Sequence, residues 1–282
     1  MRQKIEPRLM KGIRDFLPQD MIKRNYVIKV ITDVFSSFGF LPVETPALEM
    51  WETLSGKYGQ EGEQLIYRFK DRGNRDLGLR YDLTVPLSRM YAMHRNKITL
   101  PLKRYQIQPV WRADKPGKGR FREFYQCDID IVGSDDLLAD AEVIQVFYET
   151  LKKLGFSSFK IKINSRKILR GIVLASGSSI ESEADICRSI DKLDKIGYEG
   201  VASELESRGI AQGAVEKIIK IIKIKGNPTE VAEAVTPVLS SSQDAASGLE
   251  DTKKVFSILK SMEIPQEFTE FNLSLARGLD YY

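Results

Sequence analysis

The chain has 282 residues, 42% of them hydrophobic and 29% charged, with a net charge of +4, a balance that excludes a wholly disordered chain. No apolar run approaches the ~20 residues of a membrane helix, and the charged N-terminus lacks the apolar stretch of a secretory signal. Two cysteines and one histidine exclude a disulfide framework and a multi-histidine metal site, and they leave little for a nucleophilic triad. A reducing, cytoplasmic setting is expected.

The first predicted elements are a helix and a short strand. Apolar side chains recur at steps of three and four along residues 20–38, which predicts a helix. Asp20 is the expected N-cap and Gly39 the expected C-cap. Residues 40–44 then have the pattern of a short strand, which ends before Pro46.

Two more strands and a helix follow. Residues 65–70 and 77–84 are predicted strands on either side of the turn-rich residues 71–74. Pro86 is expected in the first turn of the next helix, where its missing N–H does no harm.

The clearest hairpin joins residues 103–112 to residues 121–132. The polar, glycine-rich loop between them, residues 113–120, is longer than a tight turn needs. A helix over residues 140–154 and a strand over residues 159–164 come next.

Residues 166–267 have helical patterns and no strand pattern, which predicts a helical insertion. Residues 1–165 hold 28 Lys and Arg against 21 Asp and Glu, whereas residues 166–268 hold 14 against 16. The basic first part suits a phosphate-bearing partner, although a solvated surface would explain the charge as well. Residues 271–282 return to a strand-like texture.

Alternate side chains of a strand share a face, so the second hairpin strand can be divided by parity. One side is mostly apolar and is expected to be core: Phe121, Glu123, Tyr125, Cys127, Ile129 and Ile131. The other side is polar with one ring: Arg122, Phe124, Gln126, Asp128 and Asp130. The polar side is either a wet face of an antiparallel sheet or a site that holds a base, a phosphate and an amine together.

Two further constellations are weaker. Arg80, Asp82 and Thr84 share a parity, which a binding site or an exposed strand edge would explain equally well. Arg277, before a glycine and ahead of Tyr281 and Tyr282, fits either a site or a turn followed by core aromatics.

Together these stretches resemble the catalytic part of histidyl-tRNA synthetases, which are class II aminoacyl-tRNA synthetases. Residues 11–18 are similar to the family's N-terminal signature, and residues 38–46 to class II motif 1, the dimer-interface helix and strand. Residues 111–124 resemble motif 2. Residues 79–84 and 277–282 resemble the two stretches that line the histidine pocket.

The resemblance implies an α+β fold, an antiparallel sheet flanked by helices with a helical insertion domain. The implied domains are a core (1–165), an insertion (166–268) and a return to the core (269–282). It also implies that L-histidine reacts with ATP, usually with Mg²⁺, to give histidyl-adenylate and pyrophosphate, and that histidine then passes to tRNA(His). Such a reaction needs positioning and charge neutralisation rather than a protein nucleophile. A homodimer through motif 1 is implied as well.

The site residues are carried over from the same resemblance. Arg112 and Arg277 are the implied catalytic residues, both at the α-phosphate. The residues implied to bind histidine are Asp82, Leu83, Thr84, Arg112, Gln126, Asp130, Arg277, Tyr281 and Tyr282. The residues implied to bind ATP are Arg112, Asp114, Arg122 and Phe124, with the Phe124 ring on adenine. No protein-held metal is implied.

Several features depart from the family pattern. Asp114 stands where class II enzymes usually have Glu, and Asp82 and Asp130 stand where many bacterial members have Glu. The third class II motif and an anticodon-binding domain would lie beyond Tyr282. The chain is therefore expected to be a catalytic-domain fragment that folds as a dimer with little pyrophosphate-exchange activity.

Two alternatives remain at this point. The first is the non-catalytic regulatory subunit of ATP phosphoribosyltransferase, a relative of the synthetase that binds histidine as a sensor. The intact Arg112, Gln126 and residues 277–282 argue against it, as does the helical insertion. The second is a synthetase-like RNA-binding module of a larger regulatory protein.

Overall fold

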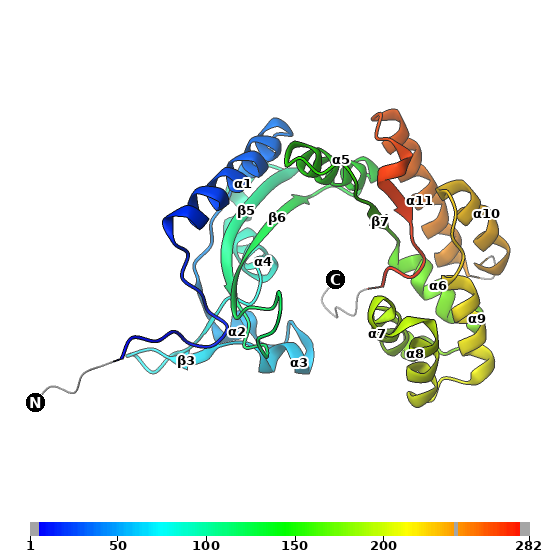
Figure 1. The fold of residues 1–282 in the computed structure, drawn as a ribbon, viewed down its shortest axis with the longest axis horizontal. Helices are drawn as coiled ribbons and strands as arrows, with labels where there is room; N and C mark the ends of the chain where they lie inside the picture. Colours follow the sequence, from blue (N-terminus) through cyan, green and yellow to red (C-terminus); the bar gives the residue numbers. More distant parts are fainter. Residues whose placement is uncertain (1–5, 240–241, 277–282) are drawn as a thin grey trace, which may run out of the picture. The chain divides into compact units, whose positions relative to one another are not determined.

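The computed structural model describes residues 6–239 and 242–276, apart from the side chains at positions 60 and 61. The described chain divides into two compact units between Ser134 and Asp135. In Figure 1 the first unit runs from blue to green and the second from green to red. The division falls earlier than the domain boundary expected after residue 165, and the predicted domain ranges stay a prediction.

The first unit alternates short helices and strands. Its helices are α1 (Pro18–Ser37), α2 (Trp51–Leu54), α3 (Gly59–Gln64), α4 (Thr84–His94) and the 3₁₀ turn η1 (Arg95–Lys97). Its strands are β1 (Leu41–Pro42), β2 (Leu48–Met50), β3 (Arg68–Lys70), β4 (Asp76–Leu79), β5 (Leu102–Trp111) and β6 (Glu123–Val132).

Helix α1 confirms the predicted helix but not its predicted start. It begins at Pro18 with Leu17 as N-cap, so Asp20 lies in the first turn and is not the cap. Proline is suited to this first position because its N–H would have no partner there anyway. The end is close to the expected one, with Phe38 as C-cap and Gly39 following at φ 77°. Only the last part of the helix is buried, at Val34 and Phe35.

The strands of this unit form two three-stranded sheets, ordered β1-β5-β6 and β2-β4-β3. The predicted hairpin is confirmed as the antiparallel pair β5–β6, with Leu102 opposite Val132 and Trp111 opposite Glu123. Strand β1 pairs with β5 in parallel. The ring of Phe35 on α1 lies 5.6 Å from the ring of Tyr105 on β5, so the helix packs on this sheet.

One buried arginine joins the two sheets. Arg80 follows β4 and is 2% exposed. Its Nε donates to the Pro109 carbonyl at 2.8 Å, and its Nη1 donates to the Thr45 carbonyl at 2.6 Å and to Gln108 Oε1 at 2.8 Å. Since β4 belongs to one sheet and Pro109 and Gln108 to the other, this side chain fixes both sheets to each other.

The second unit is mainly helical. Its helices are α5 (Leu137–Lys153), α6 (Arg166–Ser176), α7 (Glu183–Ile190), α8 (Leu193–Ser207), α9 (Gln212–Ile222), α10 (Pro228–Leu239) and α11 (Gln243–Ser261). Short 3₁₀ turns η2 (Ile180–Ser182) and η3 (Gln266–Phe268) and the strands β7 (Ile161–Ile163) and β8 (Thr269–Phe271) complete it. Across the described residues of both units, no helix combines the length and the apolarity that crossing a membrane requires.

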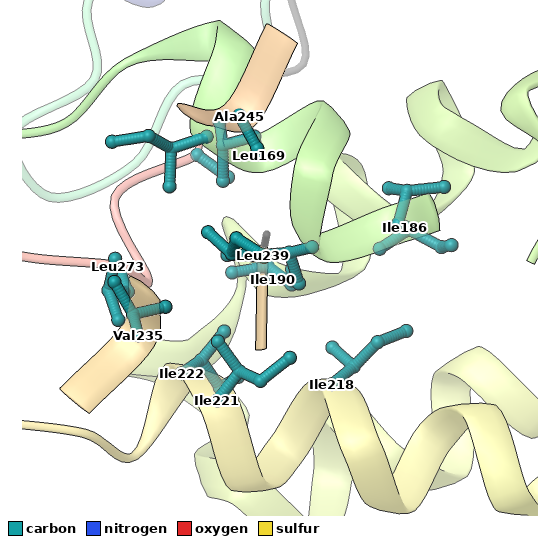
Figure 2. Close-up of a cluster of buried hydrophobic side chains, with 14 of the residues drawn as sticks. Leu169, Ile186, Ile190, Ile218, Ile221, Ile222, Val235, Leu239, Ala245 and Leu273 are labelled. Atoms are coloured by element: carbon teal, nitrogen blue, oxygen red, sulfur yellow. The ribbon is translucent and has the colours of Figure 1, made fainter. Parts of the chain in front are cut away.

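A large apolar cluster holds these helices together. Figure 2 shows side chains from α6, α7, α9, α10 and α11 meeting, with Leu273 from the segment after β8 among them. Gly171 on α6 allows the closest approach, because a Cβ there would lie 2.2 Å from the Cβ of Ala245 on α11. The predicted helical segment therefore has a core of its own.

Strands β7 and β8 bracket this helical segment. They pair in parallel, with Ile161 opposite Thr269 and Ile163 opposite Phe271. Beyond the strands, Asn164 Nδ2 donates to the carbonyl of Leu275 at 3.0 Å. The pairing confirms that the chain leaves and rejoins this strand pair at neighbouring positions.

The role of Arg80 can be tested by Arg80→Lys. A lysine keeps the charge but cannot offer the forked donors that reach three acceptors, and it leaves buried carbonyls unpaired. We expect the free energy of unfolding to fall by about 2–4 kcal/mol. Both tryptophans, Trp51 and Trp111, lie in the first unit, so their fluorescence during urea titration reports on that unit.

Arg75→Lys is the matched control. Arg75 Nη2 forms an ion pair with Asp71 at 2.6 Å, and the Arg75 side chain is 68% exposed. Exposed pairs of this kind contribute only about 0–1 kcal/mol, so this variant should unfold almost like the wild type. Equal effects of the two substitutions would contradict the role given to Arg80.

Candidate active site

The β5–β6 hairpin carries a polar face, defined by Arg104, Gln106 and Gln108 on β5 and by Gln126, Asp128 and Asp130 on β6. The strand register pairs them directly: Arg104 with Asp130, Gln106 with Asp128, and Gln108 with Gln126. Directly opposed residues of an antiparallel pair project to the same side of the sheet. The hairpin thus gathers charged and amide side chains in one place.

The parity predicted for β6 is right, but the burial expected for its apolar side is wrong. Tyr125, on the side expected to be core, is 46% exposed, and Cys127 is exposed too. Arg104 and Gln106 of the polar face are both fully buried. The reason is a hydrogen bond from Gln106 Nε2 to Thr45 Oγ1 at 2.9 Å, through which the segment after β1 covers this face.

Arg104 and Asp130 form the most buried ion pair of the polar face. Arg104 Nη2 lies 2.5 Å from Asp130 Oδ2, and the side chains are 0% and 29% exposed. Arg104 Nη1 also donates to Gln106 Oε1 at 3.3 Å. Burial raises the pKa of the Asp130 carboxyl, while the Arg104 charge acts in the opposite direction. The pair leaves Asp130 partly open to the outside.

Asp128 sits between these charges. Burial raises the pKa of its carboxyl to about 6, and the nearby Asp130 and Asp82 carboxyls act in the same direction. The Arg104 and Arg112 guanidinium groups oppose the shift. Asp128 therefore changes its protonation state just below neutral pH.

Asp82 lies at the start of α4 rather than on a strand. Strand β4 ends at Leu79, so the strand predicted over residues 77–84 is too long. Asp82 is 1% exposed, and its Oδ1 accepts from Tyr58 Oη at 3.0 Å and from the Val85 amide at 3.1 Å. The exposed-edge interpretation of Asp82 is therefore wrong.

Two acceptor atoms of the site are buried without a hydrogen-bond partner in the part of the chain that the structure describes. They are Asp82 Oδ2 and Gln126 Oε1. A buried unpaired acceptor costs about 1–3 kcal/mol, so native structures rarely keep one without a reason. Two further residues predicted to bind histidine follow Asp82 in the chain. Leu83 is fully buried, and Thr84 is the first residue of α4.

Arg112 follows β5 and lies against two rings. Its Nε donates to the Tyr81 carbonyl at 3.1 Å. Its guanidinium lies 4.3 Å from the centre of the Tyr81 ring and 5.2 Å from the centre of the Phe124 ring. A planar cation beside aromatic faces is well placed for an anion and for a flat base at the same time.

The loop between β5 and β6 is tied at its base. The Arg112 amide donates to the Arg122 carbonyl at 2.9 Å, and the Ala113 amide donates to the Leu65 carbonyl at 2.8 Å. Arg122 Nε donates to the Asp114 carbonyl at 3.0 Å. Arg122 thus uses part of its guanidinium to shape the loop and leaves the Asp114 carboxyl uninvolved in that contact.

The remaining predicted site residues, Arg277, Tyr281 and Tyr282, lie outside the described residues. The structure in turn brings forward residues that the sequence reasoning did not assign to a site. These residues are Tyr58, Tyr81 and Arg104. A parity count on the first hairpin strand would have grouped Arg104 with Gln106 and Gln108 on one face, whereas nothing in the sequence pairs Tyr58 with Asp82.

The arrangement suits a ligand with several charged parts. Carboxylates and free acceptors can receive an ammonium group, and Arg112 can hold a phosphate or a carboxylate. The rings beside Arg112 can stack on a base. Within residues 6–239 and 242–276, no group of three or more His, Cys, Asp and Glu side chains is arranged to hold a metal ion.

Comparison with known proteins decides the family. A family model described as histidyl-tRNA synthetase matches residues 12–282. The chain belongs to the histidyl-tRNA synthetase family. The histidine–tRNA ligase of Cytophaga hutchinsonii is 44% identical, over 98% of this chain and 66% of that protein. The ligase of Gloeobacter violaceus is 42% identical, over 97% of this chain and 63% of that protein.

Solved structures agree with the family and its fold. The histidyl-tRNA synthetase of Nostoc sp. PCC 7120 superposes with a TM-score of 0.86 at 34% identity, over 99% of this chain and 64% of that one. The expected class II architecture is confirmed. A Bacillus halodurans structure described as an ATP phosphoribosyltransferase regulatory subunit/histidyl-tRNA synthetase is 22% identical with a TM-score of 0.82, which supports the fold alone. The chain spans 66% or less of the length of the two curated ligases.

The charge of Asp128 can be tested by Asp128→Asn. The pKa of this carboxyl is raised from 3.8 to about 6 in the folded chain, so the folded state binds the proton more tightly than the unfolded state. Wild-type stability should therefore fall as pH rises from about 4 through about 6, and asparagine removes that loss. We expect the variant to be more stable by about 1–2 kcal/mol at pH 7 and by almost nothing at pH 4.

Tryptophan fluorescence during urea titrations between pH 4 and pH 8 measures this difference. Asp15→Asn, at an exposed carboxyl of the same unit, is the control for the loss of one surface carboxylate. A stability difference for Asp128→Asn that is the same at both ends of the range would contradict the raised pKa.

Proposed function

We propose that the chain is the catalytic part of a histidine–tRNA ligase. The reaction joins the carboxylate of L-histidine to the α-phosphate of ATP, releases pyrophosphate, and then passes histidine to tRNA(His). The single observation that carries this proposal is the pair of buried acceptors, Asp82 Oδ2 and Gln126 Oε1, in a chain of this family. The α-ammonium group of an amino acid has three donors and would satisfy both.

The amino-acid pocket follows from that assignment. Asp82, Gln126 and Thr84 are proposed to hold the α-ammonium group, with Leu83 as a buried wall. Asp130 is proposed to accept a hydrogen bond from the imidazole ring, together with Tyr281 and Tyr282. Its pairing with Arg104 supports this role, because the pair fixes one carboxylate oxygen and leaves Asp130 partly exposed.

Arg112 and Arg277 are the proposed catalytic residues. Both are assigned to the α-phosphate, where negative charge is neutralised as the carboxylate attacks and pyrophosphate leaves. Phe124 is proposed to stack on adenine, with Asp114 and Arg122 as further ATP contacts. Mg²⁺ is proposed to be held mainly by the ATP phosphates, as is usual for this ion.

The function is tested by histidine binding. By calorimetry, we expect the chain to bind L-histidine and not L-phenylalanine. Asp130→Ala removes the acceptor for the ring N–H and should weaken histidine binding by roughly 5- to 150-fold, the equivalent of ~1–3 kcal/mol. Its affinity for ATP should stay the same, and so should both affinities of the control variant Asp135→Ala.

Unchanged histidine affinity in Asp130→Ala would contradict the assignment of the imidazole end. In the full-length protein that carries this chain, histidine- and Mg²⁺-dependent exchange of pyrophosphate into ATP, followed by charging of tRNA, separates a ligase from a histidine sensor. Histidine binding without any exchange would favour the sensor. The cytoplasmic location stays a prediction.

We also propose that a second copy of this chain covers part of the first unit. Ile22 and Tyr26 on α1 are 69% and 63% exposed, and Leu41 on β1 and Tyr125 on β6 are 62% and 46% exposed. Exposed large apolar groups on adjoining elements are typical of a protein–protein interface. Leu41 lies in the stretch that resembles motif 1, and Ile22 and Tyr26 lie on the helix directly before it, which favours a homodimer.

The dimer is tested by the double variant Ile22→Glu with Tyr26→Glu. Four carboxylates, two from each copy, would then have to be buried in one interface, so sedimentation equilibrium should show a monomer. The control Met93→Glu changes an exposed apolar residue on α4, which is 67% exposed, and should leave the dimer intact. A wild-type chain that sediments as a monomer would contradict the proposal.

A further inference from the structure

A ladder of arginines and aromatic rings fastens the N-terminal segment to strand β6. The Arg14 guanidinium lies 3.2 Å from the centre of the Phe121 ring and 4.9 Å from that of Phe16. The Arg24 guanidinium lies 3.5 Å from the centre of the Phe16 ring and 4.9 Å from that of Tyr125. Cations and rings thus alternate from the end of the β5–β6 loop to Tyr125 near the start of β6, and each contact is a cation–π attraction.

The backbone beside this ladder touches the β5–β6 loop. The Arg122 amide donates to the Gly12 carbonyl at 2.8 Å, and Arg122 Nη1 donates to the Lys11 carbonyl at 3.3 Å. Gly12 has φ +89°, and a Cβ there would lie 2.8 Å from Pro116 Cγ. The N-terminal segment therefore lies directly against the loop, at a distance that only glycine permits.

The loop has few supports of its own. The β5–β6 register ends at Trp111 opposite Glu123, before the loop begins. Inside the loop the structure describes one isolated bridge, between Gly117 and Arg120. Its contacts with the N-terminal segment are thus a large part of what holds it in one conformation.

We infer that Arg14 is a positioning residue for the loop of residues 113–120, and that it acts through Phe121 and not on the substrate. This inference rests on the proposed function, which assigns Asp114 and Arg122 to ATP. Arg14 fixes Phe121, the next residue Arg122 is fixed in turn, and Arg122 Nε holds the Asp114 carbonyl at 3.0 Å. In this way the N-terminal segment and helix α1 are coupled to the part of the site assigned to ATP. They are not coupled to the part assigned to histidine.

Limited trypsin digestion of the 282-residue chain tests the coupling without any ligand. Trypsin can cut the loop after Lys118 and Arg120, and mass spectrometry identifies these cuts. Arg14→Met removes the cation and keeps an apolar stem, so loop cleavage should become at least about 5-fold faster, since local opening governs the rate. Arg14→Lys should restore most of the protection, because an ammonium group keeps part of the cation–π attraction.

Arg8→Met is the matched control, since it makes the same change at an exposed position of the same segment and should leave loop cleavage unchanged. If Arg14→Met fails to fold, hydrogen exchange in the wild type decides instead. The Arg122 amide should then be protected like the amides of β6, and exchange as fast as in Lys118 and Gly119 would overturn the inference. Loop cleavage in Arg14→Met equal to that of the wild type would overturn it as well.

Calorimetry adds a measurement that general destabilisation would not reproduce. Arg14→Met should weaken ATP binding by about 3- to 10-fold and leave histidine binding unchanged, and Arg14→Lys should recover it. Equal losses for both ligands would overturn the positioning role. A wild-type chain that binds no ATP would refute the proposed ATP site, while the digestion result would still decide whether Arg14 holds the loop.

Discussion

The geometry of the candidate site depends on the buried guanidinium of Arg80. Arg80 is the link between the two sheets of the first unit, and its three acceptors come from residues that would otherwise belong to separate surfaces. Burial lowers the pKa of Arg80, and the carboxylates of Glu44 and Glu49 act in the opposite direction. Because Arg80 directly precedes Tyr81 and Asp82, fixing it also fixes the carbonyl that orients Arg112 and the carboxylate at the start of α4.

The hairpin reverses the usual burial of a two-sided sheet. Its polar face is the deeper one, and Tyr125 on its other side is left 46% exposed. Buried charges are tolerated because Arg104 and Asp130 stand directly opposite each other as an ion pair, and because Arg104 also donates to Gln106 Oε1. The exposed apolar side is in turn available to a second protein surface. Under the proposed function, substrate recognition and subunit association would use opposite sides of this one strand pair.

The sequence predicts the elements and the parity of β6 well, because periodicity and turn residues are local properties. It fails where burial depends on distant segments. Thr45 covers Gln106 across 61 positions and Tyr58 reaches Asp82 across 24, and no local pattern encodes either contact. For the same reason the sequence pattern places Asp82 on the strand before it, although its carboxylate accepts from the Val85 amide in the first turn of α4. The expected roles of the site residues come from the family resemblance, because periodicity carries no information about them.

The parallel pair β7–β8 has a consequence for cooperativity. The free-energy cost of closing a loop of about 100 residues between β7 and β8 is roughly 2 kcal/mol higher than that of closing the short loop between β5 and β6, because the longer loop loses more chain entropy. Six backbone positions cannot offset that cost alone, so the pair exists only while α6 to α11 keep its two ends together. Loosening the Gly171–Ala245 contact would therefore be transmitted to the strands as a loss of pairing, through the apolar cluster that includes Phe271 of β8. The packed helices thus hold the two strands of this short sheet at pairing distance.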